Sequence, residues 1–167
     1  MISTFLVEHR WVAISALVLT VLVAPLLGAF LARRRRAAWV LFAVSLVPVL
    51  ALTLLPDNRV VLPGCATGGF TFSIFAVESV ANVLLLLPST LLAGVASRKP
   101  WIAIAGGSVF SAVIEATQAL VPSIGRSCDT TDWVTNTVGA VVGGLLAMMA
   151  LLIARRWARR DVDPRRR

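Results

Sequence analysis

The chain has 167 residues, of which 58% are hydrophobic and only 14% are charged, and its mean hydropathy is +0.88. A soluble domain of this size keeps much of its surface in water and cannot bury so many apolar side chains, so this class is excluded and lipid must be part of the solvent. The net charge of +8 would suggest nucleic-acid binding in a soluble protein. Here the basic residues follow long apolar stretches, where they determine membrane topology instead.

Five apolar stretches each have about the 20 residues that a helix needs to cross roughly 30 Å of hydrocarbon. A segment in lipid must satisfy its own backbone hydrogen bonds, and none of these stretches alternates with the period of a barrel strand. The sequence therefore predicts an all-α, polytopic membrane bundle of five transmembrane helices. In chain order, the predicted helices cover Trp11–Ala32, Ala37–Leu55, Glu78–Ala96, Trp101–Val121 and Trp133–Ala154.

Basic residues fall in alternate connections between the predicted helices. One set comprises Arg33–Arg36, Arg98, Lys99 and the seven arginines beyond Ala154, whereas the other side has only Arg10, Arg59 and Arg126. Because basic loops stay in the cytoplasm, we expect a multi-pass protein of the cell membrane with its N-terminus outside and its C-terminus inside. Residues 1–154 are then the transmembrane domain and residues 155–167 a basic cytoplasmic tail, and the arginines contact anionic lipid head groups rather than nucleic acid.

The two cysteines, Cys65 and Cys128, fall in different connections on the predicted outer side. Disulfides persist in oxidising compartments, so this placement favours a bond that joins the two loops, with two unpaired thiols as the alternative. A single pair provides neither a metal site made of thiolates alone nor a Cys-x-x-Cys redox motif.

Polar residues gather near the predicted outer ends of three helices. Glu115 is an ionisable residue inside a predicted span, which costs about 2.5 to 3.5 kcal/mol at the bilayer centre and indicates a functional site. The candidate residues for an outward-facing polar pocket are Glu78, Asn82, Ser111, Glu115, Gln118, Arg126, Asp129, Asp132 and Asn136. The alternative is that these side chains form only a buried network that fixes the register of the helices.

Two further features bear on how the outer ends pack. Arg126 lies between the fourth and fifth predicted helices, where it could pair with Asp129, Asp132 or Glu115. Gly139-x-x-x-Gly143 is a small-xxx-small step that allows close approach of another helix backbone.

One polar motif extends over two predicted helices and the connection between them. It runs Ser111-x-x-Ile114-Glu115-x-x-Gln118, then Gly125-Arg126-Ser127-x-Asp129-x-x-Asp132-x-x-x-Asn136-Thr137-x-Gly139-Ala140, with Glu78-x-x-x-Asn82 and Pro88 upstream. This pattern resembles the signature of the VanZ-like family over residues 78–144. Two positions depart from the family pattern: the step at Leu86–Thr90 lacks the usual aromatic residue and glycine, and Cys128 replaces an apolar residue.

The resemblance implies a small multi-spanning protein of the bacterial cell envelope. The founding member is associated with low-level resistance to the glycopeptide teicoplanin, and the resemblance carries over no catalytic activity. We therefore favour a non-enzymatic protein without a cofactor, which binds or handles an amphiphilic, lipid-linked or lipoglycopeptide ligand in the outward-facing pocket. Arg126 would attract a phosphate or carboxylate of that ligand, and the neighbouring amide side chains would donate hydrogen bonds.

Two other functions remain open at this point. One is a metal-dependent membrane enzyme acting on a lipid-linked phosphate, with a divalent cation on Glu115, Asp129 and Asp132. Against it, the only histidine is His9 in the N-terminal tail, and no nucleophile and base pair is evident. The other is a structural subunit whose Gly139-x-x-x-Gly143 face meets another protein.

Overall fold

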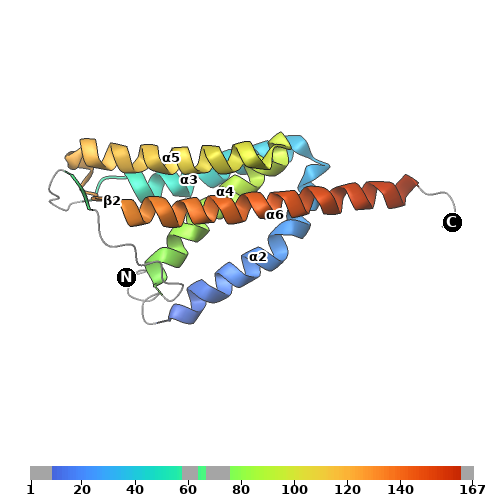
Figure 1. Ribbon diagram of the computed structural model, residues 1–167, viewed down its shortest axis with the longest axis horizontal. Helices are drawn as coiled ribbons and strands as arrows, with labels where there is room; N and C mark the ends of the chain where they lie inside the picture. Colours follow the sequence, from blue (N-terminus) through green and yellow to red (C-terminus); the bar gives the residue numbers. More distant parts are fainter. Residues whose placement is uncertain (1–8, 58–63, 67–75, 163–167) are drawn as a thin grey trace.

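The computed structural model describes residues 9–57, 64–66 and 76–162, without the side chains of residues 10, 161 and 162. Arg59 and residues 163–167, which contribute to the predicted orientation and tail, lie outside the described residues. The elements of the described part are α2 (Arg10–Ala32), α3 (Arg35–Leu54), β1 (Cys65–Ala66), α4 (Val77–Ser97), α5 (Pro100–Leu120), the short 3-10 helix η1 (Pro122–Ile124), β2 (Cys128–Asp129) and α6 (Thr130–Val162) (Figure 1).

All five predicted spans are confirmed as helices that are long and apolar enough to cross a membrane. Large apolar side chains cover the outside of the bundle; Leu22 of α2 is 67% exposed and Val47 of α3 is 64% exposed. So much exposed apolar surface is incompatible with water and is suited to lipid acyl chains. The chain is therefore an all-α, multi-pass membrane protein.

The central helix of the bundle is α4. In its most apolar stretch 67% of the residues are buried, against 11% in α3. α6 packs on it through Gly139 and Gly143, where an added Cβ atom would overlap the carbonyl oxygens of Val83 and Leu87. This confirms the predicted close helix approach. It also shows that α4 of the same chain occupies the glycine face, which is therefore not available to another protein.

The other helices surround this pair. α5 packs alongside α6, and α3 runs in a similar direction behind them, whereas α2 and α4 are inclined to the long axis of α6 (Figure 1). α2 packs closely on α6 at Gly28, where an added Cβ atom would lie 2.8 Å from the Cβ atom of Ala150. The connection between α2 and α3 is short, because α3 already begins at Arg35 rather than at the predicted Ala37. Arg35 donates a hydrogen bond from Nε to the carbonyl oxygen of Ala96 at 2.8 Å, which joins this turn to the end of α4.

The last helix is longer than predicted. The sequence indicates an end near Ala154, whereas α6 continues to Val162, so residues 155–162 of the expected tail are helical. Arginine and alanine favour helix, and no glycine or proline interrupts this stretch. Long arginine side chains can also keep their charged ends in water while their stems cover apolar surface. The helix thus extends beyond the rest of the bundle (Figure 1).

At the other end of the bundle, a disulfide joins Cys65 to Cys128, as predicted. Their Cα atoms are 4.6 Å apart, and the two cysteines face each other in a two-stranded parallel pair, β1 with β2. Thr130 adds a hydrogen bond from Oγ1 to the carbonyl oxygen of Ala66 at 3.3 Å. The connection before α4 is thereby fixed to the connection before α6.

Candidate functional site

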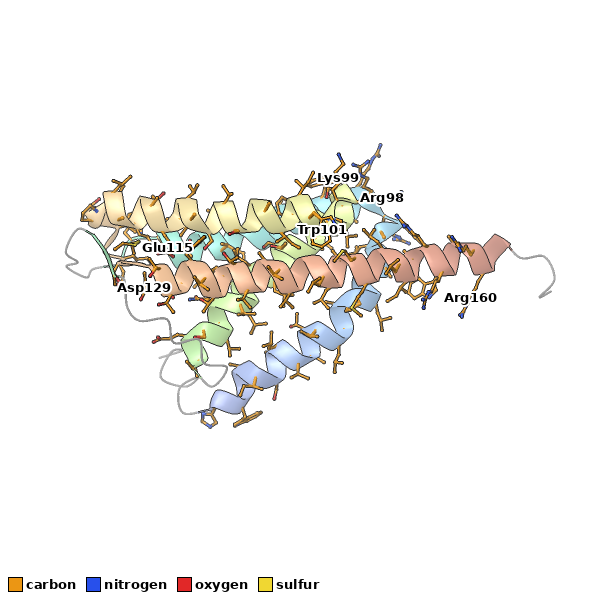
Figure 2. The ribbon with its side chains drawn as sticks, in the orientation of Figure 1. Arg98, Lys99, Trp101, Glu115, Asp129 and Arg160 are labelled. Atoms are coloured by element: carbon orange, nitrogen blue, oxygen red, sulfur yellow. A yellow bond between two sulfur atoms is a disulfide. The ribbon has the colours of Figure 1, made fainter. Side chains whose placement is uncertain are left out.

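Two of the candidate residues, Glu115 and Asp129, lie at the disulfide end of the bundle, opposite the basic residues Arg98, Lys99 and Arg160 (Figure 2). Glu115 of α5 is buried, with 7% of its surface exposed. Its Oε2 accepts a hydrogen bond from the backbone N–H of Asp129 at 2.9 Å. The expected burial of the Ser111, Glu115 and Gln118 face of α5 is confirmed. Glu115 therefore holds β2, and with it the disulfide, against α5.

Asp129 also caps the helix that follows it, α6. Its Oδ1 accepts a hydrogen bond from the backbone N–H of Thr131 at 2.8 Å. Because the first N–H groups of a helix have no partner within the helix, a side-chain oxygen just before the first turn stabilises the helix start. One residue thus receives support from α5 and caps α6.

Asp132, in the first turn of α6, joins this helix to α4. Its Oδ1 accepts a hydrogen bond from Nδ2 of Asn82 at 2.6 Å. A carboxylate in this position also interacts favourably with the positive end of the helix dipole. The spacing of Glu78 and Asn82 predicts that both lie on one face of α4; the structure brings Asn82 into the network and leaves Glu78 exposed.

Two more of the candidate residues form hydrogen bonds to the end of α3. Gln118 is buried and donates from Nε2 to the carbonyl oxygen of Thr53 at 2.9 Å. Arg126 donates from Nε to the carbonyl oxygen of Leu55 at 3.1 Å, and this guanidinium forms no ion pair with the site carboxylates. The pairing expected for Arg126 is thus replaced by a bond to the last residues of α3, which have no intrahelical partner for their carbonyl groups.

Two buried polar atoms of the cluster have no hydrogen-bond partner among the described residues. They are Oγ of Ser111, a residue with no exposed surface, and Oδ1 of Asn136, a residue that is 2% exposed. A buried polar atom without a partner costs about 1 to 3 kcal/mol. Such an atom in a native structure calls for a specific explanation, which makes these two positions the incomplete part of the network.

All nine candidate residues fall within the part of the chain that a family model matches. A family model described as VanZ/LLP1 matches residues 11–153, which is most of the chain. The chain belongs to the VanZ/LLP1 family. No curated protein and no solved structure matches it. The resemblance seen in the motif region is thereby confirmed, and the match extends it to α2 and α3.

In this VanZ/LLP1 chain the acidic side chains lie near one another without converging on one point. Glu115, Asp129 and Asp132 are within electrostatic range of each other, and Glu78 is within range of Asp132. Within residues 9–57, 64–66 and 76–162, however, no group of three or more His, Cys, Asp and Glu side chains could hold a metal ion.

The structure also contains polar contacts that the sequence analysis missed. The hydroxyl groups of Ser108 and Thr137 are 3.0 Å apart, and the indole N–H of Trp133 donates to the carbonyl oxygen of Ser108 at 3.2 Å. Ser108 lies one turn before Ser111, and this spacing is the signal that could have found it. These contacts join α5 to α6 on the side next to the candidate residues.

Apolar cavities lie away from the polar cluster. One of about 400 Å³ lies between α3, α4 and α5 and is lined by Trp39, Phe42 and Phe110, among others. A second, of about 560 Å³, lies between α2, α3 and α4 around Pro88 and Leu91. None of the nine candidate residues lines either cavity. The candidate site is thus a group of polar side chains, most of them in hydrogen bonds between elements, at the end of the bundle and not the wall of either apolar cavity.

Proposed function

We propose that this VanZ/LLP1 protein binds the polar head of an amphiphile, a lipid-linked molecule or a lipoglycopeptide, at the disulfide end of the bundle. The observation that carries the proposal is the pair of buried atoms without partners, Ser111 Oγ and Asn136 Oδ1. The hydroxyl group can donate or accept, and the amide oxygen accepts, so a ligand with N–H or O–H groups would complete both. If these side chains only fixed the register of the helices, two buried atoms without hydrogen-bond partners would lower the stability and bring no benefit.

Arg126 supplies the positive charge for such a ligand. Its guanidinium carries five N–H donors, of which only Nε–H is engaged by a described residue. A planar guanidinium binds phosphate and carboxylate groups through two parallel hydrogen bonds. Arg126 is half-buried beside the chain segment that leads to β2, so an anionic head group can reach it from the end of the bundle.

The carboxyl groups serve to hold the site together. Glu115 positions β2 and Asp132 binds Asn82, so both are engaged in contacts between elements. We assign them no reaction, and the proposed function is binding without turnover. On the predicted orientation, this end faces the extracytoplasmic side of the cell envelope, and a contribution to teicoplanin resistance forms part of the proposal.

Binding to the purified protein tests the proposal. The protein is placed in phosphatidylcholine nanodiscs, and its affinity for two probes, teicoplanin and a polyprenyl phosphate, is measured. Arg126→Gln and Asn136→Leu each remove a proposed ligand contact and should weaken binding of at least one probe about tenfold. Arg160→Gln is the matched control for charge, because Arg160 lies at the opposite end (Figure 2).

Membrane abundance and helical content separate a loss of binding from a loss of folding. The proposal holds if Arg126→Gln accumulates like the unaltered protein and binds more weakly, while Arg160→Gln binds normally. It fails if neither probe binds the unaltered protein, or if folded Arg126→Gln and Asn136→Leu both bind as well as the control.

A further inference from the structure

The basic end of the bundle contains a cavity of its own. It has a volume of about 250 Å³ and is lined by Arg33, Arg98 and Arg155 together with four apolar residues of α2 and α6. At about 30 Å³ per water molecule, this volume corresponds to roughly eight waters, which is room for a phosphate and part of a head group. The three arginines come from different parts of the chain: the end of α2, the end of α4 and the body of α6.

The described charges at this cavity are of one sign. Among the described residues that line it, the charged ones are the three arginines and the other four are apolar. Helix C-termini attract cations, which accounts for Arg33 and Arg98, since these residues directly follow α2 and α4. It does not account for Arg155, because α6 continues to Val162. Three arginines that line one cavity favour an anionic ligand.

The backbone at Arg98 supports this interpretation. Its φ angle is +58°, in the left-handed region that favours glycine at the end of a helix. Arginine in this conformation carries a steric cost that glycine would avoid. Arg98 therefore places a guanidinium at the cavity in a backbone conformation that is unfavourable for arginine. Unfavourable backbone conformations of this kind cluster at binding sites.

The surroundings place the cavity at the level of lipid head groups. The apolar span of α2 ends at Ala32, the residue before Arg33, and the guanidinium of Arg33 lies 5.8 Å from the ring centroid of Trp157 on α6. Arginine and tryptophan together are typical of the boundary between hydrocarbon and water. The apolar residues of the wall, Leu151 and Ala154 among them, adjoin the hydrocarbon layer.

We propose that this cavity binds the phosphate group of one anionic phospholipid, with Arg33, Arg98 and Arg155 as its ligands. Guanidinium groups bind phosphate oxygens through paired, charge-assisted hydrogen bonds. Basic pockets between transmembrane helices are suited to phospholipid head groups, whose acyl chains stay in the bilayer. The site lies at the opposite end from the polar cluster, so it is independent of the proposed function.

Native mass spectrometry of the protein released from micelles tests the assignment. Phosphatidylglycerol, an anionic lipid, and phosphatidylcholine, a zwitterionic one, are offered at equal concentration. We expect one phosphatidylglycerol to be retained in preference, and Arg155→Ala to weaken its retention about tenfold. Arg156→Ala is the matched control, because this adjacent arginine carries the same charge and does not line the cavity.

A second variant guards against effects on folding. Arg98→Gly removes a guanidinium and relieves the left-handed backbone, so it should bind phosphatidylglycerol more weakly while its melting temperature stays equal or rises. Competition with inorganic phosphate distinguishes a site for a lipid from a site for a free anion. At millimolar concentration, inorganic phosphate should not displace the lipid. The assignment is overturned if Arg155→Ala and Arg156→Ala behave alike, if Arg98→Gly retains the lipid normally, or if inorganic phosphate displaces it.

Discussion

Gly139 is the position where the α4–α6 contact can be tested most directly. In Gly139→Ala the added methyl group would overlap the backbone carbonyl oxygen of Val83, which cannot rotate away as a side chain can. Overpacking of this kind costs about 1 to 3 kcal/mol, and the rigid obstacle puts this variant at the upper end. Alanine regains about 1 kcal/mol through its helix propensity, so the expected net loss is about 2 kcal/mol.

Gly106→Ala is a matched control on α5, because no atom lies within 4 Å of the position of its added Cβ. It should gain the propensity term alone, about 1 kcal/mol. The free energy of unfolding is measured by titration with a denaturing detergent in mixed micelles, with helical content as the signal. Equal stability of the two variants would show that the α4 and α6 backbones are not in contact, and the alignment of Asn82 with Asp132 would then lose its basis.

Three further predictions concern the disulfide end. Replacing Cys65 and Cys128 by serine opens a loop of 63 residues and should cost at most about 4 kcal/mol, less where the helices stay inserted. A double-mutant cycle of Asn82→Ala with Asp132→Ala should show a coupling of about 1 kcal/mol, within the range of hydrogen bonds in membranes. Glu115→Gln keeps an acceptor for the Asp129 amide, whereas Glu115→Leu should lose about 1 to 3 kcal/mol.

For each of these three predictions, one experimental result would contradict it. Unfolding of the unaltered protein that does not respond to a reducing agent would contradict the stabilising role of the disulfide. Additive effects of the two alanine substitutions would show that Asn82 and Asp132 do not interact. If Glu115→Gln were as unstable as Glu115→Leu, the negative charge rather than the hydrogen bond to the Asp129 amide would be the important property.

The helices were predictable because lipid leaves the chain few alternatives. An apolar run that crosses a membrane must satisfy its backbone internally, so its length and composition determine both its type and its approximate ends. The end of α6 was missed because arginine is compatible with a helix that leaves the hydrocarbon as well as with a loop that follows it. Strands of two residues, such as Cys65–Ala66, are too short to produce a periodic pattern.

The sequence predicts which residues belong to the candidate site, but it does not predict which atoms they contact. Four-residue spacing shows that Ser111 and Glu115 share a face, and hydrophobic surroundings imply that this face is buried. The partner of Arg126 is a backbone carbonyl of Leu55, and every residue has such a group, so the sequence contains no signal for it. For the same reason, the bond from the Asp129 amide to Glu115 follows only from the path of the loop.

The Cys65–Cys128 bond makes a covalent ring that encloses α4, α5 and the short connection between them. A protease that cuts this connection after Arg98 would yield two pieces with one cysteine each, which stay together until a reductant is added. Gel migration with and without reductant would then report the state of the bond. Because trypsin added to sealed vesicles reaches one membrane face only, the same gel would reveal which compartment contains the arginine-rich end.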